Sequence, residues 1–190
     1  MKRYIKAAIS DILDEDPKFL LEYAEDINIP IDELLKLGQQ FEYYEVRWKA
    51  KDTIKRLANS SNRKRIFEGN PKLRDKFALT CYDSDLLSIF AEDPDDDVRW
   101  TVAEESMTPP EVLDKLSYDH YYQIRHAVAE NENTPDYTLA RLSKDADCFV
   151  REGVAENPKT PYAILLRLAN DESRYVREAV MKNKNFGSSV

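Results

Sequence analysis

Apolar and polar residues recur at one fixed interval through the C-terminal half of the chain. The clearest marker is an aliphatic residue followed by arginine, at steps of 26 residues: Val98-Arg99, Ile124-Arg125, Val150-Arg151 and Val176-Arg177. Other types keep the same step, among them Val102, Val128, Val154 and Val180, the Thr-Pro pairs at Thr108, Thr134 and Thr160, Leu113, Leu139 and Leu165, and Asp93, Asp119, Asp145 and Asp171. So many coincidences at one offset indicate an internal repeat.

The first part of each repeat predicts a short helix. Val98, Val102 and Ala103 are spaced so that they share one apolar face. An asparagine follows the corresponding segment in later repeats, at Asn131, Asn157 and Asn183, where a helix ends readily.

The second part of each repeat predicts another short helix. We expect Thr108 to be its N-cap and Pro109 its first residue, and Thr108 with Glu111 has the spacing of a capping box. Leu113 and Leu116 form the inward stripe. One unit is too small to bury its own apolar face, so stacked units are predicted to form an α-solenoid.

The repeat weakens toward the N-terminus without vanishing. Val46-Arg47 and Leu73-Arg74 keep a step of 25 to 27 residues, which gives about seven two-helix units in all. No stretch alternates apolar and polar residues as a strand would, so we predict an all-α fold. The expected organisation is a single α-solenoid domain over 1–190: an N-terminal capping helix at 1–15, divergent repeats at 16–92, regular repeats at 93–185 and a flexible tail at 186–190.

The regular unit, Val-Arg-x-x-Val-Ala-Glu-Asn-x-x-Thr-Pro-x-x-x-Leu-x-x-Leu-x-x-Asp, resembles the variant leucine-rich repeat. The resemblance implies a right-handed stack of α-helices alternating with shorter or 3₁₀ helices. The unit here is slightly longer than the family's usual one. Some family members also carry an N-terminal cysteine cluster for an iron-sulfur centre, but no cysteine precedes Cys81 in this chain. The resemblance therefore implies a solenoid shape and a role in binding other molecules, and it implies no cofactor.

Composition argues against an enzyme. The chain has only 4 Gly, 2 Cys and 2 His among 190 residues, too few for a Gly-rich phosphate loop or a cysteine-based zinc site. We expect no catalytic residue, no cofactor and no metal. No signal peptide or membrane-spanning run is recognisable, so a cytoplasmic protein without a membrane partner is expected.

Three candidate chemical features have simpler structural interpretations. The arginine of each repeat could follow phosphates, but an Asp precedes it by six residues, as Asp93 precedes Arg99, so a structural ion pair within or between units is favoured. The acidic run from Asp93 to Glu104 resembles a calcium loop, but Val98 stands where Gly is required. His120 and His126 lack a third ligand at helical spacing.

Aromatic residues give the strongest indication of a binding surface. Trp48 and Trp100 occupy the same variable repeat position two units apart, and His126 occupies it in the next unit. Tyr121 and Tyr122 lie just before it. Exposed aromatics beside arginine are typical of protein-binding hot spots. The alternative is that the tyrosines pack between units and seal the loops.

Charge is unevenly distributed along this acidic chain, whose net charge is -8. Residues 47–76 hold eleven basic and three acidic residues, a net charge of +8. This block is either a solvated surface that pairs with the acidic flanks or a patch for nucleic acid. The candidate nucleic-acid contacts are Arg47, Arg63, Lys64 and Arg65.

Our leading hypothesis is a non-catalytic module that binds a protein of unknown identity along one solenoid face. Nucleic-acid binding through residues 47–76 is one alternative. Another is an acidic inhibitor, of the kind encoded by phages and mobile elements, that occupies the basic groove of a nucleic-acid enzyme.

Overall fold

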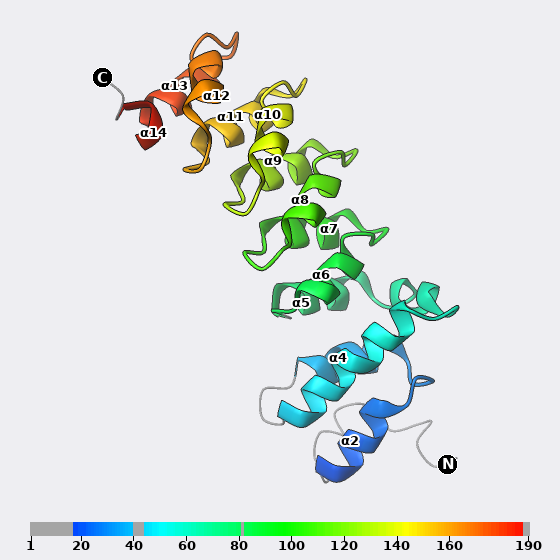
Figure 1. The fold of residues 1–190 in the computed structure, drawn as a ribbon. Coiled ribbons are helices and arrows are strands. Elements are labelled where there is room, and N and C mark those ends of the chain that lie inside the picture. The colour runs from blue at the N-terminus through cyan, green and yellow to red at the C-terminus, as the bar shows by residue number, and fades with distance from the viewer. Residues whose placement is uncertain (1–16, 40–43, 81, 188–190) are drawn as a thin grey trace. The chain divides into compact units, whose positions relative to one another are not determined.

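The computed structural model describes residues 17–39, 44–80 and 82–187, and every regular element in these ranges is a helix (Figure 1). The prediction of an all-α fold is therefore confirmed. Two compact units are present, unit 1 up to Ile89 and unit 2 from Phe90 onward. The capping helix expected at residues 1–15 lies outside the described residues.

Unit 1 contains helices of unequal length. They are α2 (Pro17–Glu25), α3 (Ile31–Gly38), α4 (Tyr44–Ala58), the 3₁₀ helix η1 (Arg63–Phe67), α5 (Pro71–Thr80) and α6 (Ser84–Phe90), the last residue of which belongs to unit 2. The longest, α4, packs against α2, α3 and η1. Its contact face is formed by Val46, Ala50, Ile54 and Leu57, which are spaced by one turn and fully buried.

Arginine side chains bind backbone carbonyls in unit 1. The Arg65 guanidinium donates to the carbonyl oxygens of Ile27 at 2.7 Å and Ile29 at 3.0 Å, in the segment between α2 and α3. Arg74, which is 2% exposed, donates to the Gly69 carbonyl. These bonds satisfy acceptors at chain turns, where no helix partner exists.

Unit 2 alternates helices of nine and seven residues. They are α7 (Asp96–Glu104), α8 (Pro110–Leu116), α9 (Tyr122–Glu130), α10 (Asp136–Leu142), α11 (Cys148–Glu156), α12 (Tyr162–Leu168) and α13 (Arg174–Lys182), followed by the short α14 (Lys184–Gly187). Helices α7, α9, α11 and α13 start 26 residues apart, and each packs against the next. In Figure 1 this series runs from green to red.

The apolar residues of the repeat form the core of unit 2. Val98, Val102 and Ala103 of α7 are buried, as are their counterparts in α9 and α11 and the two valines of α13, whereas Met181, at the position of Ala103 in α13, is 64% exposed. Leu113 and Leu116 of α8, with their counterparts in α10 and α12, are at most 2% exposed. Burial of a leucine or valine side chain contributes about 1.5–3 kcal/mol, so neighbouring helices stabilise one another mainly through these residues.

A ladder of arginine and aspartate joins successive segments of unit 2. The Arg125 guanidinium donates twice to the Asp145 carboxylate, at 2.8 and 3.0 Å, and also to the carbonyl of Asp119 at 2.8 Å. Arg99 with Asp119 and Arg151 with Asp171 repeat the arrangement. Each aspartate belongs to the following repeat, 20 residues beyond its arginine, so the favoured structural interpretation of this ladder is confirmed.

The aspartates of this ladder are stabilised in their ionised form. Burial by itself would raise the pKa of Asp119, Asp145 and Asp171, yet the hydrogen bonds from arginine and from backbone N–H groups hold each pKa below its ordinary value. The ladder therefore consists of charged pairs at neutral pH.

Asparagine forms a second ladder. Asn157 ends α11, and its side-chain amide donates to the carbonyls of Ala129 at 2.7 Å and Asn131 at 3.0 Å in the preceding repeat. Asn131 and Asn183 make the equivalent bonds. All three are helix C-caps in extended conformation, as the position of asparagine in the repeat predicts.

The predicted capping role of Thr108 is wrong. Helix α8 begins at Pro110, its N-cap is Pro109, and no side chain caps it. The Thr108 hydroxyl instead donates to the Val102 carbonyl at 2.6 Å, near the end of α7. The buried hydroxyl thus satisfies an orphan carbonyl of the preceding helix, which the capping pattern did not reveal.

The C-terminal part of unit 2 is helical further than expected. The tail predicted from residue 186 begins inside α14, and the Phe186 ring stacks on Tyr162 with ring centres 5.8 Å apart. Residues 188–190 lie outside the described ranges. Among the described helices, none is long and apolar enough to cross a membrane.

Candidate functional site

Four of the five residues predicted to bind a partner gather in one hollow of unit 2. Trp100 of α7, Tyr122 and His126 of α9, and Tyr121 just before α9 line an open hollow of about 430 Å³. Phe149 of α11 completes its aromatic wall, with the carboxylates of Asp96 and Asp97 at its edge.

The register of each helix explains why these side chains face solvent. In α7, Val98 and Val102 point into the core, so Asp96, Trp100 and Glu104, spaced by four residues, share the opposite side. The same register in α9 places Tyr122, His126 and Glu130 on the solvent side. Burial of the valines thus fixes the direction of the binding residues.

The aromatic rings of the hollow are partly ordered by one another. The Tyr122 and Phe149 rings stack at 6.0 Å with an interplanar angle of 27°. The guanidinium of Arg99 lies 5.9 Å from the centre of the Tyr121 ring, which also meets His120 edge-on. Trp100 remains 42% exposed and Phe149 50% exposed. A partner could therefore bury additional area on rings that are already positioned.

His126 is held between α9 and α11. Its Nδ1 atom lies 2.8 Å from the carbonyl oxygen of Phe149, and its Nε2 atom lies 3.5 Å from Glu130. Gly153 leaves the space for the ring, because a Cβ atom there would lie 2.8 Å from Nδ1. His126 is therefore a positioned part of the hollow wall.

A row of glutamates continues the hollow surface across three helices. Glu104, Glu130 and Glu156 are the last residues of α7, α9 and α11, and all three are exposed. Desolvation, and then repulsion from Glu130, raise the pKa of Glu104. Desolvation, and then repulsion from Glu152 and Glu130, raise the pKa of Glu156. The charges of the row therefore act on one another.

The sequence contains a signal for this row. The three glutamates recur at the 26-residue step within the Val-Ala-Glu-Asn part of the repeat. The predicted site rests on aromatic residues and on the net charge of whole segments, and it does not include this row. Phe149, the second residue of α11, is likewise absent from the predicted site.

Trp48, the fifth predicted residue, belongs to a separate site in unit 1. It is 55% exposed and, with Leu21, Tyr44, Glu45 and Lys49, lines a shallow hollow of about 290 Å³. The Lys49 ammonium lies 5.7 Å from the indole centre and pairs with Glu25 at 3.2 Å. Trp48 is thus a surface residue, as predicted.

The predicted nucleic-acid residues of unit 1 have different environments. Lys64 is exposed and Arg63 half-buried on η1. The Arg65 guanidinium is engaged by backbone carbonyls, and that of Arg47 lies over the Tyr44 ring at 5.4 Å. Elsewhere in the basic block, Lys55 pairs with Asp83 and Asp85. The block therefore pairs in part with neighbouring acidic residues.

The remaining reactive residues do not form a recognisable site. Asp93 accepts a hydrogen bond from the backbone N–H of Asp95 and so shapes the turn before α7. Cys148 is a half-buried free thiol at the start of α11. In the described ranges, no three His, Cys, Asp or Glu side chains are grouped as metal ligands.

Comparison with known proteins gives no relative from which a function could be transferred: no family model matches the sequence, and no curated protein matches it.

Proposed function

We propose that this chain is a non-catalytic interaction module that binds another protein through the aromatic hollow on α7, α9 and α11. The observation that carries the proposal is the convergence of Trp100, Tyr122, His126 and Phe149 from three helices onto one open surface. Aromatic rings that are ordered yet solvent-exposed are the usual anchors of protein interfaces.

The architecture proposed for this module is a right-handed α-solenoid of about seven repeats, related to the variant leucine-rich repeat and located in the cytoplasm. The 26-residue spacing of the nine-residue helices supports it in unit 2. In unit 1, Arg74 donates to the carbonyl five residues earlier, as Arg99 does to Pro94. This shared contact supports extension of the repeat toward the N-terminus.

The decisive experiment compares aromatic residues inside and outside the hollow. We expect Trp100→Ala to abolish capture of a partner from lysate, while Tyr137→Ala on α10 captures it normally. Tyr137 is a matched control because it is 60% exposed and outside the hollow. Trp48→Ala tests whether unit 1 contributes to binding.

Circular dichroism of each variant separates binding from folding. Because Trp100 is 42% exposed, Trp100→Ala is expected to keep the helical signal and melting temperature of the original chain. A folded Trp100→Ala variant that captures the same partner equally well contradicts the proposal. A variant that unfolds would show that Trp100 is a core residue, which also contradicts it.

Nucleic-acid binding is the second candidate function, and exposed cations of unit 1 favour it. Arg56, Lys64, Lys72 and Lys76 are all exposed within the basic block. The expected result is retarded migration of DNA or RNA at low salt, lost on Lys64→Ala and steeply weakened by added salt. Unretarded nucleic acid at low salt would exclude this function.

A further inference from the structure

We propose that the partner segment recognised by the hollow and the glutamate row is an extended, arginine-bearing stretch of protein. This inference rests on the proposed function and specifies its partner chemistry. The surface that carries it is the acidic-aromatic face, defined as Trp100, Tyr122, Phe149, Asp96, Asp97 and the row Glu104, Glu130 and Glu156.

Charge on the acidic-aromatic face is predominantly negative. Asp96, Asp97 and the three glutamates are all exposed. The arginines of the same helices point elsewhere: Arg99, Arg125 and Arg151 bind the ladder aspartates and backbone carbonyls. Among the described residues, neither Glu104 nor Glu156 forms an ion pair with Lys or Arg. A cationic partner segment is complementary to such a surface.

Repulsion within the row supports the same conclusion. The raised pKa of Glu104 and Glu156 reflects desolvation first and neighbouring carboxylates next, and these outweigh the opposing effects of His126 on both groups and of Lys182 on Glu156. A cation bound between two of these carboxylates would offset their repulsion and form an ion pair with them. Binding of a cation is therefore favoured at this row more than at an isolated surface carboxylate.

The aromatic rings of the hollow favour arginine over lysine as the cation of the partner segment. A guanidinium is planar, stacks on an aromatic face and donates two parallel hydrogen bonds to a carboxylate. Here the Trp100 ring stands one helical turn before Glu104, on the same side of α7. One guanidinium can thus use a ring and a carboxylate of the same helix.

The repeat spacing also defines the form of the partner segment. Packed helices lie about 8–10 Å apart, and a chain in the extended polyproline II conformation advances about 3.1 Å per residue with three residues per turn, so every third side chain faces the same way. One arginine at every third residue would therefore meet Glu104, Glu130 and Glu156 in turn. A chain crossing the three helices in this way is extended.

The test uses a fluorescent nine-residue peptide, (Gly-Ser-Arg)₃, and measures its binding to the full chain by fluorescence anisotropy. A peptide with citrulline in place of arginine keeps the shape and removes the charge. We expect the arginine peptide to bind, the citrulline peptide to bind at least about tenfold more weakly, and added salt to weaken only the former. Equal binding of the two peptides, or no binding of either at low salt, overturns the inference.

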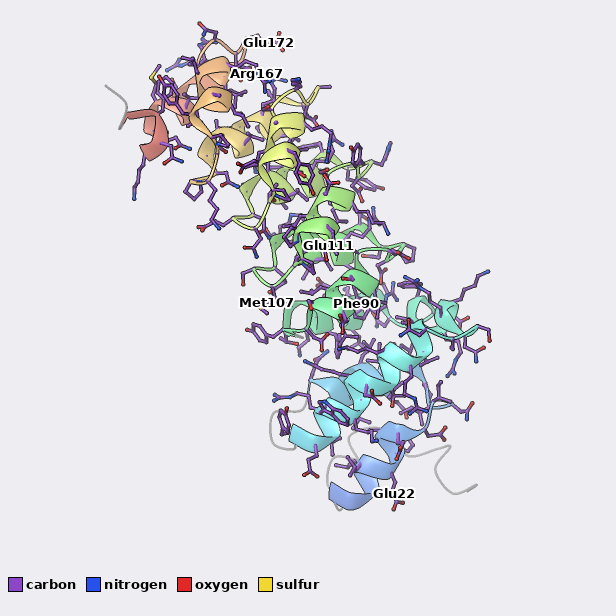
Figure 2. The ribbon with its side chains drawn as sticks, in the orientation of Figure 1. Glu22, Phe90, Met107, Glu111, Arg167 and Glu172 are labelled. Atoms are coloured by element: carbon purple, nitrogen blue, oxygen red, sulfur yellow. The ribbon has the colours of Figure 1, made fainter. Side chains whose placement is uncertain are left out.

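Variants then locate the peptide on the surface. Trp100→Ala and the pair Glu104→Gln/Glu130→Gln are each expected to weaken the arginine peptide by about tenfold. The matched control is Glu111→Gln/Asp136→Asn, which removes the same charge from exposed positions on α8 and α10; Glu111 is labelled in Figure 2. An equal effect of the control pair would show non-specific attraction and overturn the inference.

Failure of this inference can be distinguished from failure of the proposed function. If the peptide does not bind but Trp100→Ala still abolishes capture of a lysate partner, the module binds a protein of other chemistry, and only the arginine-bearing partner is overturned. If Trp100→Ala leaves both capture and peptide binding unchanged while folded, the hollow itself is not the binding site.

Discussion

Units 1 and 2 use arginine in different ways to hold a helical stack together. In unit 2 the helices start at equal intervals, so each ladder arginine meets the aspartate of the next repeat, as Arg125 meets Asp145. In unit 1 the 15-residue α4 and the 3₁₀ helix η1 interrupt that spacing, and Arg65 binds two backbone carbonyls instead. Because the helices are equally spaced, the same arginine–aspartate contact recurs from one repeat to the next and forms a ladder.

The same difference separates the two candidate binding surfaces. Equal spacing in unit 2 repeats the solvent-facing register of α7 in α9 and α11, so that aromatic rings and glutamates accumulate on one face. In unit 1, Trp48 stands among Lys49, Tyr44 and Glu45 in a smaller hollow. A regular stack can thus build an extended face from a few side chains per helix.

The largest expected effect comes from breaking the ladder where it is most buried. The Arg151 side chain is 8% exposed, and Arg151→Ala leaves the Asp171 carboxylate without its bidentate partner. We expect a loss of about 3 kcal/mol in the free energy of unfolding, measured in urea. Arg65→Ala, which removes two bonds to partly exposed carbonyls, should cost about 1 kcal/mol. Equal losses would remove the contrast between the units.

The second largest loss of stability is expected from breaking the asparagine ladder. Asn157 is 1% exposed, and Asn157→Ala leaves the carbonyls of Ala129 and Asn131 without its two hydrogen bonds. We expect a loss of about 2 kcal/mol in the free energy of unfolding, because unsatisfied buried acceptors retain their desolvation cost. The exposed Asn59 of unit 1 is the control, and Asn59→Ala should change that energy by less than about 0.5 kcal/mol. A neutral Asn157→Ala would show that the amide ladder contributes no stability.

A third pair of variants compares close helix packing in the two units. Gly38 of α3 faces the fully buried Phe77 ring, and a Cβ at residue 38 would lie 2.4 Å from it. Gly38→Ala should therefore destabilise by about 1 kcal/mol or more, since the buried ring cannot move freely. Gly153→Ala meets the half-exposed His126 ring, which can swing outward, and its Cβ would lie 3.2 Å from the Cβ of Ala129, so the gain in helix propensity offsets most of the cost of these contacts.

These two glycine variants are measured by thermal unfolding and by peptide binding. Gly153→Ala is expected to melt near the original temperature while weakening binding, because His126 leaves the hollow wall. A Gly153→Ala variant that is less stable than Gly38→Ala would contradict this ranking.

Local periodicity was sufficient to predict the helices of unit 2, the arginine ladder and the surface position of Trp100. It failed at Thr108, because a hydroxyl can either accept from a helix N-terminus or donate to a carbonyl of the preceding helix, and tertiary contact selects the second. It also failed to predict that Arg65 would be engaged by the segment between α2 and α3, some 36 to 38 residues away. Contacts outside the repeat carry no periodic signal.

The smallest expected effect concerns the glutamate row, which the aromatic pattern alone did not reveal. Desolvation and neighbouring carboxylates, Glu130 among them, raise the pKa of Glu104 and Glu156. A carboxyl with a raised pKa in the folded state favours folding at low pH, and this contribution is lost as pH rises through that pKa. Glu130→Gln should therefore lower the pKa of both Glu104 and Glu156 and make the stability of the fold depend less on pH.

The measurement is an NMR titration of the glutamate side-chain carboxyl carbons in the original chain and in Glu130→Gln. Both Glu104 and Glu156 should titrate at lower pH in the variant, because one repulsive charge between them is gone. Glu111→Gln on α8 is the control and should leave both titrations in place. If Glu130→Gln moves neither titration, the three carboxylates do not act as one charged row. The acidic-aromatic face of unit 2 would then differ from the surface around Trp48 only in its aromatic rings.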